Sequence, residues 1–274
     1  MKQGIKKGCC VVLGMAVLLA GYGYGVEPRR LKVRHLTVSG RGTKDFRMVF
    51  FSDTHFGKYY PQSRAEHLMQ LIKAQAPDLV LFGGDLVDQY VRDEQQLDLS
   101  SLAQCLGSLS SPQGVYAVWG NHDYSGGGIG IYEKVMNEAS VTLLKNEAIY
   151  LPDLDMTLMG IDDSFYGTPV WQKAWDEAKG TRILLGHEPD EAAAMAGDVD
   201  LILSGHSHGG QVRLPVVTQL FLPPGAHTYI KGLFERENGA ILVSSGVGMT
   251  KLPLRLGNPP EIWVIDVKSD QGRR

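Results

Sequence analysis

Five short polar clusters, each placed directly after a run of apolar residues, are the feature of this 274-residue chain that most limits how it can fold. In chain order they are Asp53-Thr54-His55, Gly83-Gly84-Asp85, Gly120-Asn121-His122-Asp123, Gly186-His187-Glu188 and Gly205-His206-Ser207-His208. An apolar run that ends in such a cluster is typical of a buried strand whose carboxyl end carries a functional side chain. The pattern therefore predicts an α/β fold in which several strands contribute to one site.

Strand-like and helix-like segments alternate in the first half of the chain, whereas the second half is richer in strands. The predicted strands are residues 31–38, 47–51, 79–82, 115–119, 156–159, 183–185, 201–203, 241–243 and 262–265. The predicted helices are residues 63–76, 95–109, 129–139, 170–178 and 188–196. Ser63 and Glu66 have the spacing of a capping box at the first helix. We expect two mixed sheets packed face to face, with the helices outside.

Charge and cysteine content exclude several classes of protein. The net charge of −3 and the isoelectric point of about 6.2 provide no basic surface, so we expect no nucleic-acid partner. No feature of the sequence indicates a protein partner. Cys105 is the only cysteine outside the N-terminal segment, which excludes a disulfide within the main body and a zinc site built from cysteines. Cys105 lies outside all five clusters, and we interpret it as a core residue.

The first 28 residues are predicted to be a membrane anchor or a signal segment, and residues 29–274 the functional domain. Residues 9–25 carry no charge and follow three lysines. We favour a single uncleaved anchor in the cell membrane, because no Ala-x-Ala cleavage site is present. The side of the membrane stays open, since basic residues flank the apolar stretch at both ends: Lys2, Lys6, Lys7, Arg29, Arg30, Lys32 and Arg34.

The five clusters contain the side chains that a pair of divalent metals requires. The i, i+2 spacing of Asp53 and His55 lets both side chains converge on one ion, and His206 and His208 repeat this spacing. Asp85 follows two glycines, and its two carboxylate oxygens suit it to bridge two cations. Each cluster alone has a structural alternative, such as a turn or a histidine pair bonded to backbone carbonyls. Their conjunction favours a paired-metal site, which is the usual device for hydrolysing phosphate esters.

These clusters and their order resemble the calcineurin-like metallophosphoesterase superfamily over about residues 45–267. The resemblance is closest to a bacterial membrane-associated branch, because of the Gly-His-Ser-His-Gly-Gly-Gln run at 205–211 and the Gly-Asn-Pro-Pro-Glu run at 257–261. That branch includes enzymes that split UDP-2,3-diacylglucosamine and enzymes that act on cell-wall phosphodiesters. The superfamily implies a four-layer αββα sandwich, in agreement with the alternation of strands and helices.

The resemblance also implies a role for each site residue. One metal would be bound by Asp53, His55 and His208, and the other by Asn121, His187 and His206, with Asp85 bridging both. His122 would face the substrate, where it protonates the leaving oxygen or stabilises charge on the phosphate. Asp123 would orient His122, although a simple turn cap is an equal alternative for this residue.

Two cations about 3.5–4 Å apart can share a water and lower its pKa towards neutrality, so that hydroxide attacks phosphorus in line. Oxygen ligands mixed with imidazoles suit Mn²⁺, Fe or Zn²⁺, and we favour Mn²⁺. Because an anchor accompanies the site, the predicted substrate is a membrane-associated phosphodiester or pyrophosphate such as UDP-2,3-diacylglucosamine.

Other hypotheses are a broad-specificity cell-wall phosphodiesterase and a non-catalytic metal-binding scaffold; DNA hydrolysis is disfavoured by the charge balance. Two further features bear on the substrate. The partly apolar loop 215–234 is a candidate for contact with a lipid or an acyl chain, the alternative being a loop packed on its own core. Arg255 is a candidate for clamping a phosphate.

Overall fold

The computed structural model describes residues 2–215 and 217–270, with the side chains of residues 2–12, 173 and 174 excepted. Two six-stranded sheets form its centre, with strand orders β1-β12-β2-β3-β4-β5 and β10-β11-β9-β8-β7-β6. The first contains β1 (Lys32–Gly40), β2 (Phe46–Phe51), β3 (Leu79–Phe82), β4 (Val115–Ala117), β5 (Thr142–Leu143) and β12 (Glu261–Ser269). The second contains β6 (Glu147–Leu151), β7 (Met156–Gly160), β8 (Thr181–Leu185), β9 (Leu201–Ser204), β10 (Gly232–Arg236) and β11 (Gly239–Val243).

Three separate apolar cores show that the two sheets are the inner layers of a four-layer sandwich. The central core contains side chains from both sheets, among them Met48 and Leu81 from the first and Leu158 and Leu203 from the second. A second core lies between the first sheet and its helices, and a third covers the outer face of the second sheet. Because each sheet is covered on both faces, its central strands are apolar on consecutive positions. The predicted αββα sandwich is confirmed.

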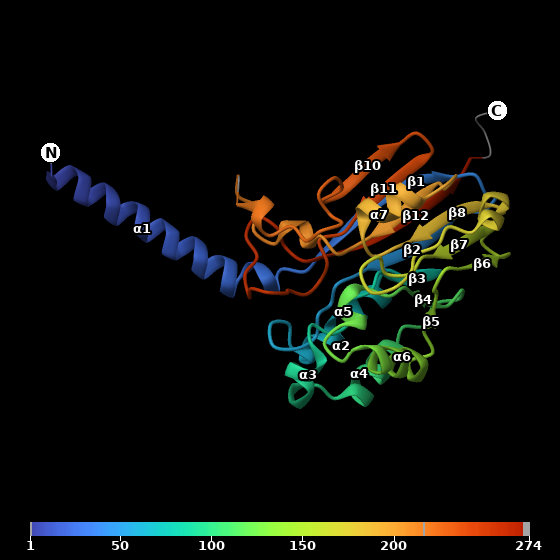
Figure 1. Cartoon of the computed structure of the whole chain (residues 1–274), viewed down its shortest axis with the longest axis horizontal. Helices are drawn as coiled ribbons and strands as arrows, with labels where there is room; N and C mark the ends of the chain where they lie inside the picture. Colours follow the sequence, from blue (N-terminus) through green and yellow to red (C-terminus); the bar gives the residue numbers. More distant parts are fainter. Residues whose placement is uncertain (1, 216, 271–274) are drawn as a thin grey trace.

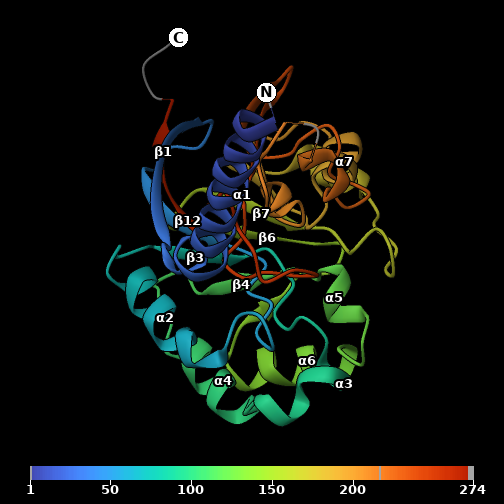
Figure 2. The same ribbon diagram turned by 90° about the vertical axis from the view of Figure 1, so that its left-hand side faces the viewer.

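The outer layers are short amphipathic helices. The first sheet is covered by α2 (Ala65–Lys73), α4 (Leu99–Gly107) and α6 (Ile129–Glu138), whereas α7 (Pro189–Met195) lies on the second sheet, on the other side of the sandwich (Figures 1 and 2). The short helices α3 (Tyr90–Asp93) and α5 (Asn121–Tyr124) follow β3 and β4. In the parallel strands β2, β3 and β4 the carboxyl ends point the same way, which brings the loops after them together.

The structure corrects two predictions about helices. The predicted capping box at Ser63 is wrong, because a 3₁₀ turn (Gln62–Arg64) precedes α2 and no side chain caps this helix. The predicted helix at residues 170–178 is a shorter 3₁₀ segment, Lys173–Glu177. By contrast, α4 begins at a cap that pattern reading did not identify, where the Ser101 N–H donates to Asp98 Oδ1 at 3.0 Å.

All nine predicted strands are present, with ends at most four residues from the expected ones, whereas β5, β6 and β10 were not predicted. These three strands lie at sheet edges, and their sequences have weak strand patterns. β5 has only two residues, and β6 and β10 keep exposed positions along their length. Edge strands carry less apolar sequence because one side faces solvent.

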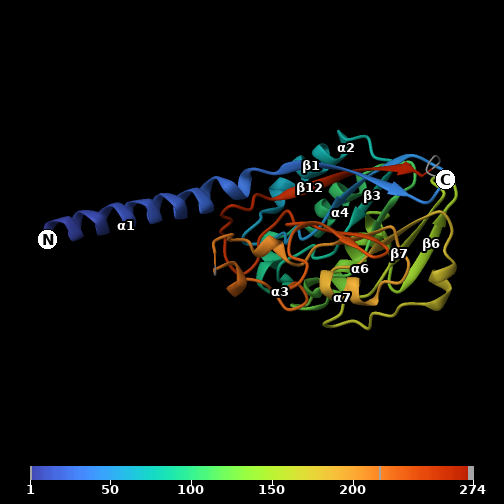
Figure 3. The ribbon, with the colours of Figure 1, turned by 90° about the horizontal axis from the view of Figure 1, so that it is seen from above.

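The N-terminal helix α1 (Lys2–Gly25) projects from the body, and the two chain ends lie at opposite ends of the molecule (Figures 1 and 3). Within the described part of the chain, no helix has both the length and the apolar character needed to cross a bilayer. The apolar stretch of the predicted anchor falls partly on residues 9–12, whose side chains lie outside the described residues. Glu27, on the N-terminal side of the predicted domain boundary, is 3% exposed and packs into the body.

Candidate metal centre

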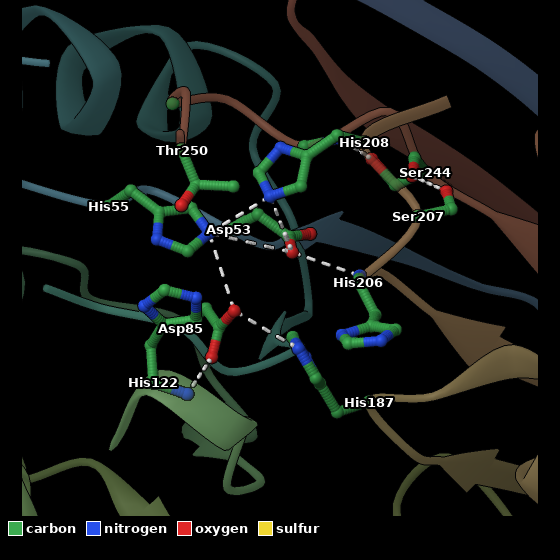
Figure 4. Close-up of polar contacts among 12 residues, drawn as sticks. Asp53, His55, Asp85, His122, His187, His206, Ser207, His208, Ser244 and Thr250 are labelled. Atoms are coloured by element: carbon green, nitrogen blue, oxygen red, sulfur yellow. Dashed lines mark hydrogen bonds and ion pairs between the residues drawn. The ribbon is translucent and has the colours of Figure 1, made fainter. Parts of the chain in front are cut away.

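Side chains from all five polar clusters lie close together (Figure 4). Each cluster begins within three residues of the carboxyl end of a different strand, namely β2, β3, β4, β8 or β9. The structure thus brings together Asp53, His55, Asp85, Asn121, His122, His187, His206 and His208. Except for Asn121 and His122, which are half-buried, these residues are at most 5% exposed.

Left-handed backbone conformations occur at most of these positions. The backbone φ angle is +52° at Asp53, +43° at His55, +61° at Asp85, +63° at His206 and +48° at His208. A residue other than glycine reaches this region at an energetic cost of about 1 kcal/mol or more, and such residues concentrate at functional sites. These positions lie in the turns after β2, β3 and β9. The backbone at these positions therefore adopts strained conformations where the side chains come together.

One group of ligand atoms consists of Asp53, His55 and His208. The Nε2 atoms of His55 and His208 lie 3.0 Å apart, and His208 Nε2 lies 3.6 Å from Asp53 Oδ1. Two nitrogens that each coordinate one ion at about 2.0–2.1 Å have roughly this separation. These three side chains could hold one divalent cation.

A second group consists of Asp85, His187 and His206, and Asp85 also connects the two groups. Asp85 Oδ2 lies 3.2 Å from His187 Nε2 and 3.3 Å from His55 Nε2. Asp85 Oδ1 accepts the backbone N–H of His122 at 2.8 Å, which fixes the carboxylate plane. A single carboxylate thus faces both groups, which is the position that a bridging ligand requires.

Backbone carbonyls fix the protonation of three imidazoles. The Nδ1 of His187 donates to Gly83 O at 2.6 Å, and the Nε2 of His206 donates to Pro224 O at 2.8 Å. The Nδ1 of His122 donates to Asp88 O at 2.5 Å. Because a carbonyl oxygen only accepts, the proton must sit on the named nitrogen, and the other ring nitrogen remains for the site. Metal-binding histidines commonly have this arrangement.

The electrostatics of the site favour bound cations. Burial lowers the pKa of His206 to about 3 and that of His208 well below its ordinary value, so both rings stay neutral as metal ligands must. At His55 burial acts in the same direction, but Asp85 and Asp88 outweigh it and raise the pKa to about 10. A proton on His55 thus supplies positive charge that a metal ion would supply instead.

Some buried polar atoms at the site have no hydrogen-bond partner, and such atoms show whether the residues could bind a pair of metal ions. Among the described side chains these atoms include Asp53 Oδ2, Asn121 Oδ1 and His187 Nε2, all at the site. Leaving such atoms unbonded costs about 1–3 kcal/mol each. Carboxylate and amide oxygens combined with imidazole nitrogens are donors that divalent transition metals accept. The donor set therefore fits two divalent cations.

Asp123 does not contact His122 among the hydrogen bonds of the described residues. Its Oδ2 accepts the backbone N–H groups of Asp85 at 2.7 Å and of Gly120 at 2.9 Å, and its Oδ1 accepts that of Leu86 at 2.9 Å. Asp123 thus accepts from backbone N–H groups, as the turn-cap interpretation predicts, and does not orient His122 through a hydrogen bond. Asp123 ties the loops after β3 and β4 together, and thereby holds the backbone on which Asp85 and His122 sit.

Asp88 is a site residue that sequence reasoning missed. Its Oδ1 lies 3.4 Å from His55 Nδ1 and accepts the Thr250 hydroxyl at 2.8 Å, while Oδ2 accepts Arg92 Nη2 at 2.6 Å. Because its backbone carbonyl also accepts from His122, Asp88 contacts two site histidines at once. The only sequence signal was its place three residues after Asp85, in the same polar turn.

The Gly-Asn-Pro-Pro run near the end of the chain supports the site through Asn258. The side chain of Asn258 is fully buried, and its Nδ2 donates to the backbone carbonyl of His208 at 2.5 Å. Its Oδ1 accepts Lys231 Nζ at 2.7 Å. The backbone N–H groups of Gly257 and Asn258 both donate to the carboxylate of Glu27. Asn258 therefore links the start of the domain to the loop that carries His208.

We expect Asn258→Ala to weaken metal binding about 10–100-fold, because the loop of His208 loses its buried support. Calorimetric titration with Mn²⁺ measures this change. Asn137→Ala, at an exposed asparagine of α6, is the matched control and should leave the affinity unchanged. Unchanged Mn²⁺ affinity in Asn258→Ala would show that the loop holds His208 without this contact.

Arg255 does not clamp a substrate phosphate, contrary to expectation. Its side chain is 0% exposed, and its Nη2 donates to the backbone carbonyls of Ser245 at 2.8 Å and Gly248 at 2.6 Å. Its Nη1 donates to Asn258 O at 3.2 Å. The guanidinium is thus used inside the protein, where it braces the loops behind Asp53. An isolated arginine in an apolar sequence gives no sign of such carbonyl partners.

A pocket of 220 Å³ opens over the ligands. On one side it is lined by site residues, including Asp85, Asn121 and His122, and on the other by aromatic and proline side chains. Phe221, Pro223 and Pro224 of the loop 215–234 belong to this second wall, whereas Leu222 of the same loop is buried. The loop is therefore partly packed on the body and partly a wall of the site.

Comparison with known proteins gives the same assignment as the geometry. Residues 46–210 match the model of the family described as calcineurin-like phosphoesterase. The chain is 32% identical to an uncharacterized metallophosphoesterase, YkuE, of Bacillus subtilis, over 96% of each chain. It is also 32% identical to the phosphodiesterase YaeI of Escherichia coli, over 90% of this chain and 92% of that one.

A more distant relative is described as a transmembrane protein with a metallophosphoesterase domain, from Danio rerio; it is 29% identical over 81% of this chain and 53% of its own length. The family match covers more than half of the chain, and two relatives exceed 30% identity over nearly all of it. The chain therefore belongs to the calcineurin-like phosphoesterase family and is a metallophosphoesterase.

Proposed function

We propose that this metallophosphoesterase hydrolyses phosphodiesters or pyrophosphates with two divalent cations, of which Mn²⁺ is favoured. One cation is held by Asp53, His55 and His208, the other by Asn121, His187 and His206, with Asp85 between them. The observation that carries the proposal is the position of Asp85, whose Oδ2 lies 3.2–3.3 Å from a ring nitrogen of each group. Membership of a family with a named phosphodiesterase relative supports the reaction type.

When bound, the two cations would supply the positive charge that lowers the pKa of a shared water and neutralises the phosphate oxygens. The residues of the chain do the rest. Asp85 and the histidines set the position of that charge, and the carbonyl of Asp88 keeps the Nδ1 proton of His122 in place. In the doubly protonated form of His122, which is half-buried at the pocket, the Nε2 proton is then available for the leaving oxygen while Nδ1 keeps its own.

We further propose that the substrate is associated with a membrane, as in a lipid-linked pyrophosphate such as UDP-2,3-diacylglucosamine, and that α1 keeps the enzyme at the bilayer. Supporting this, α1 exposes large apolar side chains, including Leu13 at 67% and Leu18 at 74%. Fractionation of cells that express the full chain or a version without residues 2–22 tests the anchoring. Equal recovery of both versions in the soluble fraction would contradict it.

The test of the function is an assay of the purified full chain, stripped of metal with a chelator and reloaded with Mn²⁺. The panel contains a phosphomonoester, a phosphodiester, a nucleotide pyrophosphate and UDP-2,3-diacylglucosamine. We expect Mn²⁺-dependent hydrolysis of diesters or pyrophosphates and little turnover of monoesters. A chain that binds two Mn²⁺ ions and hydrolyses none of the panel would instead be a metal-binding scaffold.

A further inference from the structure

The pocket over the ligands has two chemically different parts. Its polar part is formed by candidate ligands and His122 with Gln211, Thr250 and Lys251, whereas Phe165, Tyr166 and Phe221 form an apolar part together with Pro223 and Pro224. Phe165 is 43% exposed and Tyr166 62% exposed, which leaves large apolar surfaces open at the site. A phosphate group by itself would not bind to these apolar side chains, because its oxygens interact with cations and polar donors.

Buried carboxylates hold the two aromatic residues in place. Asp163 is 0% exposed, and its Oδ1 accepts the backbone N–H groups of Phe165 at 3.0 Å and Tyr166 at 2.6 Å. Glu188, which is 2% exposed and directly follows His187, accepts the backbone N–H of Ser164 through Oε2 at 3.2 Å. The loop that carries the two rings is thus tied to the segment after β8 that contains the candidate ligand His187.

The aromatic loop and the proline loop both contact His206. The ring of Phe165 lies 5.5 Å from that of His206, measured between centroids, and the carbonyl of Pro224 accepts from its Nε2. The apolar part of the pocket therefore begins directly beside a candidate ligand. A group attached to a phosphorus atom at the metals would reach this wall without a spacer.

We propose that this wall binds an apolar substituent of the phosphoester, a planar ring or an alkyl chain that is bonded to the phosphoryl group. This inference rests on the proposed function and adds the chemical class of the substrate. Exposed aromatic rings on a fixed loop lose little conformational freedom when a ligand packs on them. The pocket volume of 220 Å³ lies below the range of about 300–1,000 Å³ for drug-sized ligands. The wall thus suits one ring or one chain segment next to phosphorus.

Binding of phosphonates that differ only in the group on phosphorus tests the inference without catalysis. The full chain, loaded with Mn²⁺, is titrated calorimetrically with methyl-, phenyl-, cyclohexyl- and n-hexylphosphonate. We expect the larger groups to bind about tenfold or more tightly than methyl, because each buries apolar surface that methyl lacks. Phenyl ahead of both cyclohexyl and hexyl would identify a planar ring as the natural substituent, and hexyl ahead of phenyl a chain.

Two variants show which residues produce this preference. In Phe165→Ala and Tyr166→Ala the ratio of phenyl to methyl affinity should fall to within about threefold, while methylphosphonate binds as before. Tyr150→Ala is the matched control, since Tyr150 is also exposed, at 42%, but lies on β6 and does not line the pocket. Melting temperatures confirm that the variants are folded.

The outcomes separate this inference from the proposed function. Equal binding of methyl- and phenylphosphonate to the unmodified chain would overturn the inference and leave the metal site intact. An unchanged phenyl preference in both variants would also overturn it, because another surface would then be responsible. Failure of every phosphonate to bind would contradict the proposed metal function itself.

Discussion

Replacing Asp85 by asparagine is expected to lower kcat about 10³-fold or more and to reduce the number of Mn²⁺ ions bound. The asparagine side chain has the same shape and can still accept the N–H of His122. It lacks the negative charge, however, and its amide group would point a donor at His55 Nε2 or His187 Nε2, which lie 3.2–3.3 Å away. The change therefore acts on both metal groups at once, with the fold retained.

Asp153→Asn is the matched control for this prediction. Asp153 lies in the exposed turn before β7, away from the carboxyl ends of the strands that carry the site. Metal content measured by elemental analysis and kcat measured with saturating Mn²⁺ should both stay at the unmodified values in the control. If Asp85→Asn kept two Mn²⁺ ions and full turnover, Asp85 would not bridge the metals.

Replacing His122 by alanine is expected to slow turnover by about 10²–10⁴-fold while both metal ions remain bound. His122 lines the pocket, and its Nδ1 is engaged with the Asp88 carbonyl, so only its Nε2 is available to the substrate. The metal content should match that of the unmodified chain, as should that of His67→Ala, an exposed histidine of α2. Loss of metal with an unchanged rate per bound ion would show that His122 is a ligand.

The leaving group separates two roles for His122. If this residue protonates the leaving oxygen, the loss in His122→Ala should be large for an alkyl leaving group and small for p-nitrophenol, which departs readily as an anion. If it stabilises charge on the phosphoryl oxygens, the loss should be similar for both. Steady-state rates of two diesters that share the same second substituent make this comparison.

The fold, and the meeting of the site residues at one place, were predictable because both depend on local sequence patterns. Consecutive apolar residues identified strands buried on both faces, and each polar cluster marked the end of one of them. Parallel strands place such ends together, so the separate clusters predicted a common site. The order of the clusters then identified the family, which the comparison with known proteins confirmed.

The contacts that support the site were not predictable, because their partners lie far apart in the chain. Glu27 and Asn258 are separated by 231 positions, and Asn258 and His208 by 50. Arg255 resembles a surface charge in sequence, and only the folded loop supplies the carbonyls that surround it. The role of Asp123 depended in the same way on whether its nearest donors were backbone or side chain.

Crystals of the full chain soaked with Mn²⁺ test the central claim most directly, through the anomalous scattering of the metal. The account predicts two anomalous peaks, one among Asp53, His55 and His208 and the other among Asn121, His187 and His206, with Asp85 between them. A single peak, or peaks away from these side chains, would contradict it.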